Sequence, residues 1–267
     1  TVTRAAAEQT GLTPGTPVTA GSVDTVAATL GAGALNDGDL AITIGSSGRL
    51  CYVSSAPNFD ERLINAHTIN DNYLIIQTTN NAGVSLRWFK DTFGQAARGK
   101  SGQTDDSIYD RINFEVEQTR AGAEGMIYLP YLSGEKSPIW DTAARGVFFN
   151  IGLDSGFGTF ARAVMEGVAF SIRDCADAVM ASTRGDTPIP LGGGAANSRV
   201  WSQIFADVLD RPIRRLRNSE TETLGDIIIA ARAAGINEIP LDFGKSLAGF
   251  GELLYPNKDN AAIYDSL

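Results

Sequence analysis

One carboxylate in the sequence stands where it could take a proton from a hydroxyl group. Asp24 follows Gly21-Ser22-Val23 and opens a predicted helix over residues 24–35 that is rich in alanine and glycine. Such a helix can pack closely against other backbone and hold the carboxylate rigidly at a cleft, as a general base requires. The alternative is a plain N-cap for the helix, and the local pattern favours this second interpretation.

A glycine turn follows with a different chemistry. Gly45-Ser46-Ser47-Gly48 links two predicted strands over residues 40–44 and 49–53. Because its residues are small, its backbone N–H groups could approach an anion such as a phosphate. The alternative is an ordinary hairpin turn, which the pattern alone favours.

A second glycine turn lies between a predicted strand and a predicted helix. Gly192, Gly193 and Gly194 are followed by Asn197 and Ser198. The three glycines permit the backbone to approach a flat ligand closely. The alternative is a helix-entry turn in which Asn197 or Ser198 caps the helix.

The sequence also contains the pattern of a phosphate-cradling P-loop. Residues 94–101, from Gly94 to Lys100-Ser101, satisfy G-x-x-x-x-G-K-[ST]. Such a loop works only between a strand and a helix, whose N-terminus faces the phosphates. Here residues 86–91 are predicted to be helical and residues 102–106 are polar. We therefore interpret the match as chance within a mobile surface loop over 94–106, and keep a P-loop NTPase that uses Lys100 as an alternative.

Charged residues elsewhere have simpler explanations. The basic run over residues 211–217 could attract phosphate, but a solvated edge strand is favoured because charges on an edge prevent aggregation. On one long predicted helix, Arg162 and Glu166 stand four residues apart, as do Arg173 and Asp177. We expect both to be surface ion pairs, worth about 0.2–0.5 kcal/mol each.

Composition limits the class of protein. The 267 residues, 43% of them hydrophobic, suffice for one or two domains of roughly 100–200 residues with a real core. A net charge of -9 disfavours nucleic-acid or membrane partners, and no run reaches the ~18 apolar residues of a membrane span. Cys51 and Cys175 lack zinc-site spacing and fit a reducing cytoplasm. The single histidine, His67, is expected at the surface or at a strand end.

Predicted strands and helices alternate along the chain, which favours a single compact α/β domain. The expected strands cover residues 17–20, 40–44, 49–53, 73–78, 126–130, 189–191 and 213–216. The expected helices cover residues 4–10, 24–35, 84–93, 107–117, 159–182, 199–209 and 223–234. The helix over 159–182 is the longest, and its apolar residues keep helical spacing.

Several segments occur in an order that is typical of one enzyme family. They are PVTAGSVD (17–24), IGSSG (44–48), NAGVSLRW (81–88), LPYLSGEKSP (129–138) with Asp141 and ARG (144–146), ARAVMEGVAF (161–170) and the turn over 192–197. Together they resemble the FGGY family of carbohydrate kinases over nearly the whole chain. Within that family the sequence is most similar to xylulokinases and next to gluconokinases.

The resemblance implies a fold, a reaction and a set of site residues. The fold would be an α/β, actin-like (ribonuclease H-like) ATPase domain with a mixed sheet flanked by helices. The reaction would be phosphorylation of a sugar hydroxyl by ATP and Mg²⁺, with no metal site in the chain itself. Asp24 matches the family's catalytic base. The positions that match nucleotide contacts are Gly45, Ser46, Ser47, Gly48, Gly83, Arg87, Gly193, Gly194 and Asn197.

The sequence departs from the family pattern at some of these places. Ser46-Ser47 replaces the usual Thr-Ser of the phosphate loop. Thr25 follows the matched base where Asn, Gln or Gly is common. The segment over 222–226, which begins with Glu222, carries polar residues where small ones are frequent. Thr25 therefore leaves the identity of the sugar open.

Family members are roughly twice as long, and this chain starts just before the matched base. We therefore expect residues 1–267 to be the C-terminal nucleotide-binding domain of a sugar kinase, without the N-terminal sugar-binding domain and its Asp-x-Gly-Thr loop. Its partners would be ATP, a small sugar, that N-terminal domain and a second copy in a homodimer. Alone, it should bind nucleotide weakly and turn over little sugar. An alternative of another class is a non-catalytic actin-like module used for protein association.

Overall fold

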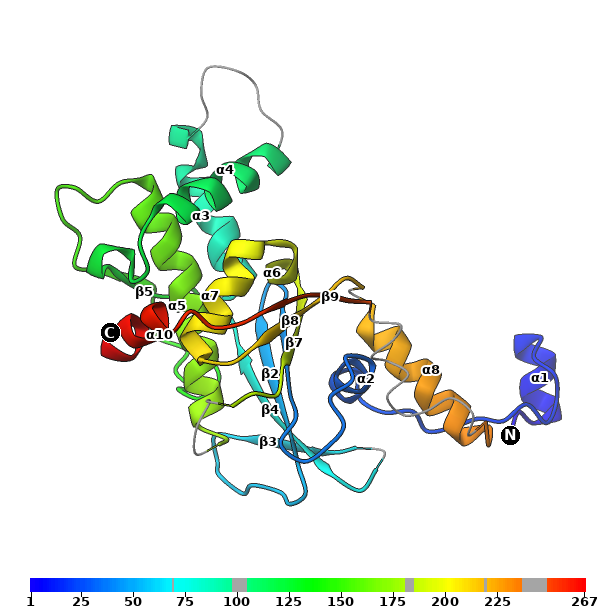
Figure 1. Cartoon of the computed structure of the whole chain (residues 1–267). Coiled ribbons are helices and arrows are strands. Elements are labelled where there is room, and N and C mark those ends of the chain that lie inside the picture. The colour runs from blue at the N-terminus through cyan, green and yellow to red at the C-terminus, as the bar shows by residue number, and fades with distance from the viewer. Residues whose placement is uncertain (69, 98–104, 181–184, 219, 237–248) are drawn as a thin grey trace.

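A seven-stranded mixed sheet forms the centre of the molecule (Figure 1). The computed structural model describes residues 1–68, 70–97, 105–180, 185–218, 220–236 and 249–267. The strand order is β3-β4-β2-β1-β7-β8-β9, with β1 parallel to β7 and β7 parallel to β8, and the remaining neighbours antiparallel. The strands are β1 (Leu40–Ile44), β2 (Gly48–Ser54), β3 (Ile64–His67), β4 (Tyr73–Thr79), β7 (Ile189–Gly193), β8 (Ile213–Leu216) and β9 (Phe250–Leu254).

Helices cover both faces of this sheet (Figure 1). One face packs on α3 (Gly83–Ala97), α5 (Phe157–Asp177) and α7 (Arg199–Leu209), which share one large core with it. The other face packs on α2 (Asp24–Gly31) and α8 (Thr221–Ala233). The remaining helices of the described residues are α1 (Arg4–Thr10), α4 (Asp105–Gln118), the 3₁₀ turn η1 (Ala123–Gly125), α6 (Gly194–Asn197) and α10 (Lys258–Ser266). The strand β5 (Ile127–Leu129) pairs with β6 (Val147–Phe149) in a second small sheet.

Small residues let α2 and α8 pack backbone to backbone, as the composition of the predicted helix over residues 24–35 suggested. A Cβ atom added to Gly31 would overlap the carbonyl oxygen of Thr221, and one added to Gly225 would overlap that of Ala27. Any larger residue at either glycine would have to push the two helices apart. This contact fixes α2, the helix that begins at Asp24, relative to α8.

Most predicted elements are confirmed, but some are wrong in extent or kind. Residues 17–20 are not a strand, and the helix from Asp24 ends at Gly31 because Gly33 has a left-handed φ of 83°. Val23, not Asp24, is the N-cap residue. The strands β3, β6 and β9 and the helix α10 were not expected. His67 ends β3, as anticipated, with its ring centroid 4.6 Å from that of Tyr73.

Two predictions about charged residues are also wrong. The basic run is not an edge strand, because β8 lies between β7 and β9. Arg162 and Glu166 are not at the surface, since they are 7% and 2% exposed. Their ion pair measures 2.6 Å, and the phenol of Tyr264 on α10 donates to the same Glu166 oxygen at 2.6 Å. The pair therefore ties the end of the chain to α5.

Arg162→Ala is expected to lower the free energy of unfolding by about 3–5 kcal/mol, because it leaves the Glu166 carboxylate buried without its counter-charge. Urea denaturation measures this change. Arg111→Ala is the matched control, since Arg111 also pairs at i,i+4, with Glu115, but is 53% exposed. The control should lose about 1 kcal/mol or less. Equal losses in the two variants would contradict the prediction.

Candidate functional site

The turn between β1 and β2 is the hairpin that the sequence predicted, and α3 begins against it. The Gly83 N–H donates to the carbonyl of Gly45 at 2.9 Å, and the Val84 N–H donates to that of Ser46 at 3.0 Å. A Cβ on Gly83 would overlap the Gly45 carbonyl, so only glycine allows this approach. In the described part of the chain, the N–H groups of Ser46 and Ser47 donate no hydrogen bond. They are therefore free for an anion.

The second glycine turn meets the first at the carboxyl ends of parallel strands. Ile44 at the end of β1 is in register with Gly193 at the end of β7. Gly193 has a φ of 78°, and a Cβ there would overlap the Ile44 carbonyl. Ser198 caps α7, its hydroxyl accepting from the Trp201 N–H at 3.2 Å, as one of the two sequence alternatives proposed. In α/β sheets, ligands bind at such carboxyl ends.

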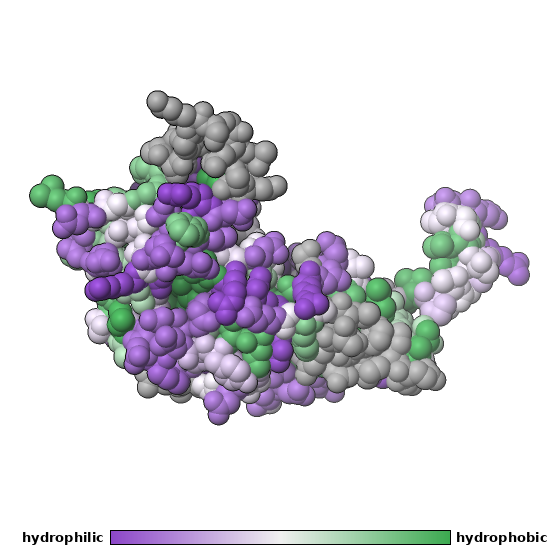
Figure 2. All heavy atoms as spheres, turned by 45° about the horizontal axis from the view of Figure 1, so that its top comes forward, coloured by the Kyte–Doolittle hydropathy of each residue, from purple (hydrophilic) through white to green (hydrophobic). Residues whose placement is uncertain are grey.

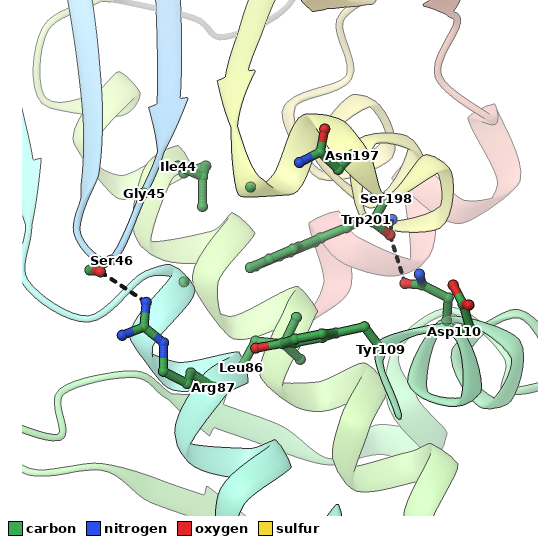
Figure 3. A pocket seen from close by; sticks show the side chains of 13 residues that line it. Ile44, Gly45, Ser46, Leu86, Arg87, Tyr109, Asp110, Asn197, Ser198 and Trp201 are labelled. Atoms are coloured by element: carbon green, nitrogen blue, oxygen red, sulfur yellow. Dashed lines mark hydrogen bonds between the residues drawn. The ribbon is translucent and has the colours of Figure 1, made fainter. Parts of the chain in front are cut away.

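A cavity of about 500 Å³ opens between these turns and the helices α3, α4 and α7 (Figure 3). Among the residues predicted from the sequence, it is lined by Gly45, Ser46, Gly83, Arg87, Gly194 and Asn197. The structure thus brings together predicted residues from three separate segments of the chain. Ser47, Gly48 and Gly193 do not line the cavity but shape the turns beside it.

Arg87 supplies the positive charge at the mouth of the cavity. It is an exposed residue of α3, and its Nη2 donates to the hydroxyl of Ser46 at 3.1 Å (Figure 3). The guanidinium therefore lies beside the free N–H groups of the turn. This arrangement suits the phosphate groups of a ligand, since arginine and backbone N–H groups both favour phosphate oxygens.

The sequence interpretation missed the aromatic residues of the cavity. Trp201 from α7 and Tyr109 from α4 extend into the space, one above the other in Figure 3. Trp201 is fixed because its indole N–H donates to the carbonyl of Met165 at 3.1 Å. Asn113, one helical turn after Tyr109, accepts from the Ser198 hydroxyl at 2.8 Å. The i,i+4 spacing of Tyr109 and Asn113 was visible in the sequence, but only the fold shows which surface they face.

Asp24 is not among the residues that line this cavity. It is the first residue of α2, and its side chain is 75% exposed. One carboxylate oxygen, Oδ1, accepts from the Thr25 N–H at 2.5 Å and from the Thr25 hydroxyl at 3.1 Å. Asp24 therefore faces solvent, where a second molecule or domain could reach its carboxylate.

The two cysteines, Cys51 and Cys175, are both buried. Burial is the main cause that raises the pKa of Cys51 to about 11, and burial also raises the pKa of Cys175. Neither thiol is therefore a thiolate nucleophile at neutral pH.

Within the described residues, no three His, Cys, Asp or Glu side chains are grouped so that they could hold a metal ion. In the same part of the chain, every helix is too short or too polar to cross a membrane.

The P-loop pattern lacks its structural context. Gly94, its first glycine, lies inside α3, and the three residues that follow continue this helix. Lys100 and Ser101 lie outside the described residues. A P-loop follows a strand, and here a helix occupies that place.

The sequence is similar to those of known carbohydrate kinases. The chain matches the model of the FGGY family of carbohydrate kinases, C-terminal domain, over residues 40–234. It is 31% identical to a gluconokinase from Bacillus subtilis, covering 97% of this chain and 51% of that protein. It is 30% identical to a xylulose kinase from Staphylococcus epidermidis, covering 99% of this chain and 52% of that protein. The chain thus spans about half the length of the curated relatives it matches.

Solved structures agree with the sequence comparison. A ligand-bound xylulose kinase from Lactobacillus acidophilus superposes with a TM-score of 0.87 at 26% identity, over 99% of this chain and 52% of that one. A gluconate kinase from the same organism superposes with a TM-score of 0.85 at 27% identity, with the same coverage. The actin-like ATPase fold expected from the sequence, with a mixed sheet flanked by helices, is confirmed.

Proposed function

The chain belongs to the FGGY family of carbohydrate kinases, and from this premise we propose that it is the C-terminal, nucleotide-binding part of an enzyme that phosphorylates a sugar hydroxyl with MgATP. One observation carries the proposal: residues from three separate segments, matched to nucleotide contacts by sequence, line one cavity. The N-terminal half of the kinase would supply the opposite wall of the active site and most of the sugar pocket.

The cavity suits ATP in size and in chemistry. A volume of about 500 Å³ lies within the range of about 300–1,000 Å³ that is usual for small-molecule sites. The aromatic pair Trp201 and Tyr109 offers flat apolar surface to a base. The free N–H groups of Ser46 and Ser47, with Arg87, suit the phosphates. Local donors thus bind an anion on a chain whose net charge is -9.

Magnesium fits this proposal as an ion that arrives with the nucleotide. Mg²⁺ keeps several water ligands and binds substrate phosphates, so it needs few protein ligands. The described residues offer no cluster that would hold it alone. When bound, it neutralises charge on the phosphates, while the turns of this chain hold and orient them.

Asp24 is proposed as the general base that accepts the proton of the sugar hydroxyl. Its exposed carboxylate stands at the start of a helix held firmly against α8. The acceptor is proposed to be a xylulose-type pentulose, with gluconate as the alternative, because relatives of both names are similar to this chain at 30% and 31% identity. A homodimer, suggested by family resemblance alone, would appear as twice the monomer mass in light scattering.

The decisive test is a kinase assay of the complete gene product against a panel of sugars that includes xylulose and gluconate. Phosphorylation of one of them supports the proposal, and no turnover of any sugar contradicts it. Calorimetry of the 267-residue chain with MgATP tests the cavity separately. No heat at millimolar nucleotide, together with self-association, would favour a non-catalytic association module. Robust sugar turnover by the 267 residues alone would contradict the need for an N-terminal half.

Lys100→Ala is expected to leave sugar kinase activity at the level of the wild type, because the residues proposed to bind ATP and to accept the proton do not include Lys100. The assay is the same as above, with kcat and the KM for ATP measured in the complete protein. A collapse of activity would restore the P-loop interpretation of residues 94–101.

A further inference from the structure

The residues around Asp24 include two positions at which the sequence departs from the family pattern. Thr25 follows Asp24 directly, and Glu222 lies in the first turn of α8. Arg49, the second residue of β2, connects them. Its side chain is only 21% exposed and points to the sheet face that carries α2 and α8.

Arg49 is held at both ends of its guanidinium. Its Nη1 donates to the hydroxyl oxygen of Thr25, and its Nη2 lies 3.5 Å from Oε1 of Glu222. Nη1 also lies 4.0 Å from Oδ1 of Asp24. Because the guanidinium is planar and rigid, two anchored nitrogens fix its orientation.

The hydroxyl of Thr25 links the guanidinium of Arg49 to the carboxylate of Asp24. A threonine hydroxyl has one proton to donate and lone pairs to accept. Since it accepts from Arg49, its proton is directed to Oδ1 of Asp24, at 3.1 Å. Oδ1 also accepts the Thr25 N–H, whereas Oδ2 accepts no hydrogen bond from the residues that the structure describes. One carboxylate oxygen is therefore anchored and the other is open.

We propose that Arg49 is a positioning residue for Asp24: through the Thr25 hydroxyl, it holds Oδ1 so that Oδ2 is presented to the sugar hydroxyl. This inference rests on the proposed function, in which Asp24 is the general base. Orientation of the base matters because a misplacement of about 1 Å can cost a factor of about 10² in rate.

A purely structural role for Arg49 explains the contacts less well. The helices α2 and α8 already touch through Gly31 and Gly225, so they need no arginine to hold them together. The carboxylates of Asp24 and Glu222 are 75% and 54% exposed, and such exposed pairs add little stability. What Arg49 adds is a fixed direction for the two side chains at the start of α2.

The test uses Arg49→Gln in the complete kinase. We expect kcat to fall about tenfold, a part of the roughly 10²–10⁴-fold that a general base contributes, while the KM for MgATP and the melting temperature stay unchanged. Arg49→Lys, which keeps a donor for Thr25 but lacks the planar guanidinium, should recover only a part of the loss. Arg62→Gln is the matched control, since it removes another arginine–carboxylate pair, with Asp60, at 2.6 Å in a separate loop.

A double-mutant cycle separates positioning from a direct role. If Arg49 acts through Thr25, Arg49→Gln should change kcat little in a Thr25→Val background. Additive losses, or a kcat of Arg49→Gln equal to that of an active wild type, would overturn the inference and leave the proposed function intact. A wild-type kinase without activity on any sugar would overturn both.

Discussion

Asp24→Asn is expected to lower the kcat of the complete kinase by roughly 10²–10⁴-fold, the usual contribution of a general base. The amide keeps the size of the side chain but cannot accept the proton of the sugar hydroxyl. Nucleotide binding should be unchanged, because Asp24 is not among the residues that line the cavity. Steady-state kinetics with saturating sugar, together with calorimetric titration of MgATP, measure the two effects separately.

Asp154→Asn is the control for this substitution, because Asp154 is an exposed aspartate in the loop before α5. It should leave both kcat and nucleotide affinity at the level of the wild type. A kcat within a few-fold of the wild type for Asp24→Asn would show that another group accepts the proton. Asp24 would then be no more than a residue of the first helical turn.

Gly83→Ala is expected to weaken MgATP binding by at least about tenfold. The new Cβ would overlap the carbonyl of Gly45, so the start of α3 and the β1–β2 turn must separate. This movement breaks the Gly83–Gly45 hydrogen bond and displaces the N–H groups offered to the phosphates. Overpacking of this kind also costs about 1–3 kcal/mol of stability. Calorimetry gives the affinity, and urea denaturation gives the stability.

Gly94→Ala provides a matched control that also tests the P-loop pattern. Gly94 lies near the other end of α3, and a Cβ there would make only an ordinary contact, 3.5 Å from Ile108. MgATP affinity should therefore equal that of the wild type. If Gly94→Ala abolished binding and Gly83→Ala did not, the phosphates would be bound by residues 94–101 and the proposed cavity would be wrong.

Much of the architecture was predictable because its signals are local. The hairpin with its turn at Gly45–Gly48, the long helix α5 and the strand, turn and helix from β7 to α7 all have short-range patterns of apolar residues and glycines. Such patterns depend on neighbours within a few residues, so the sequence alone reveals them. The short strand β6 was missed because it is defined by its pairing with β5, in which Ile127 is opposite Phe149, a residue distant in the sequence.

Long-range contacts explain why the two predictions about charged residues were wrong. Arg162 and Glu166 have the spacing of a surface pair, but α10, 98 residues further along the chain at Tyr264, covers them. The basic run is interior to the sheet because β9 pairs with β8. Neither fact leaves a signal near the residues concerned.

The sequence by itself determined the family, the alternation of strands and helices and the two glycine turns, because these depend on residue order and short spacings. Only the tertiary structure decided which residues share a surface. It placed Tyr109 and Trp201 at the cavity of the two turns, and it joined Arg49 to Thr25 beside Asp24. Strand pairing and helix packing bring distant segments together, so the site is formed by residues from several segments and no single segment reveals it.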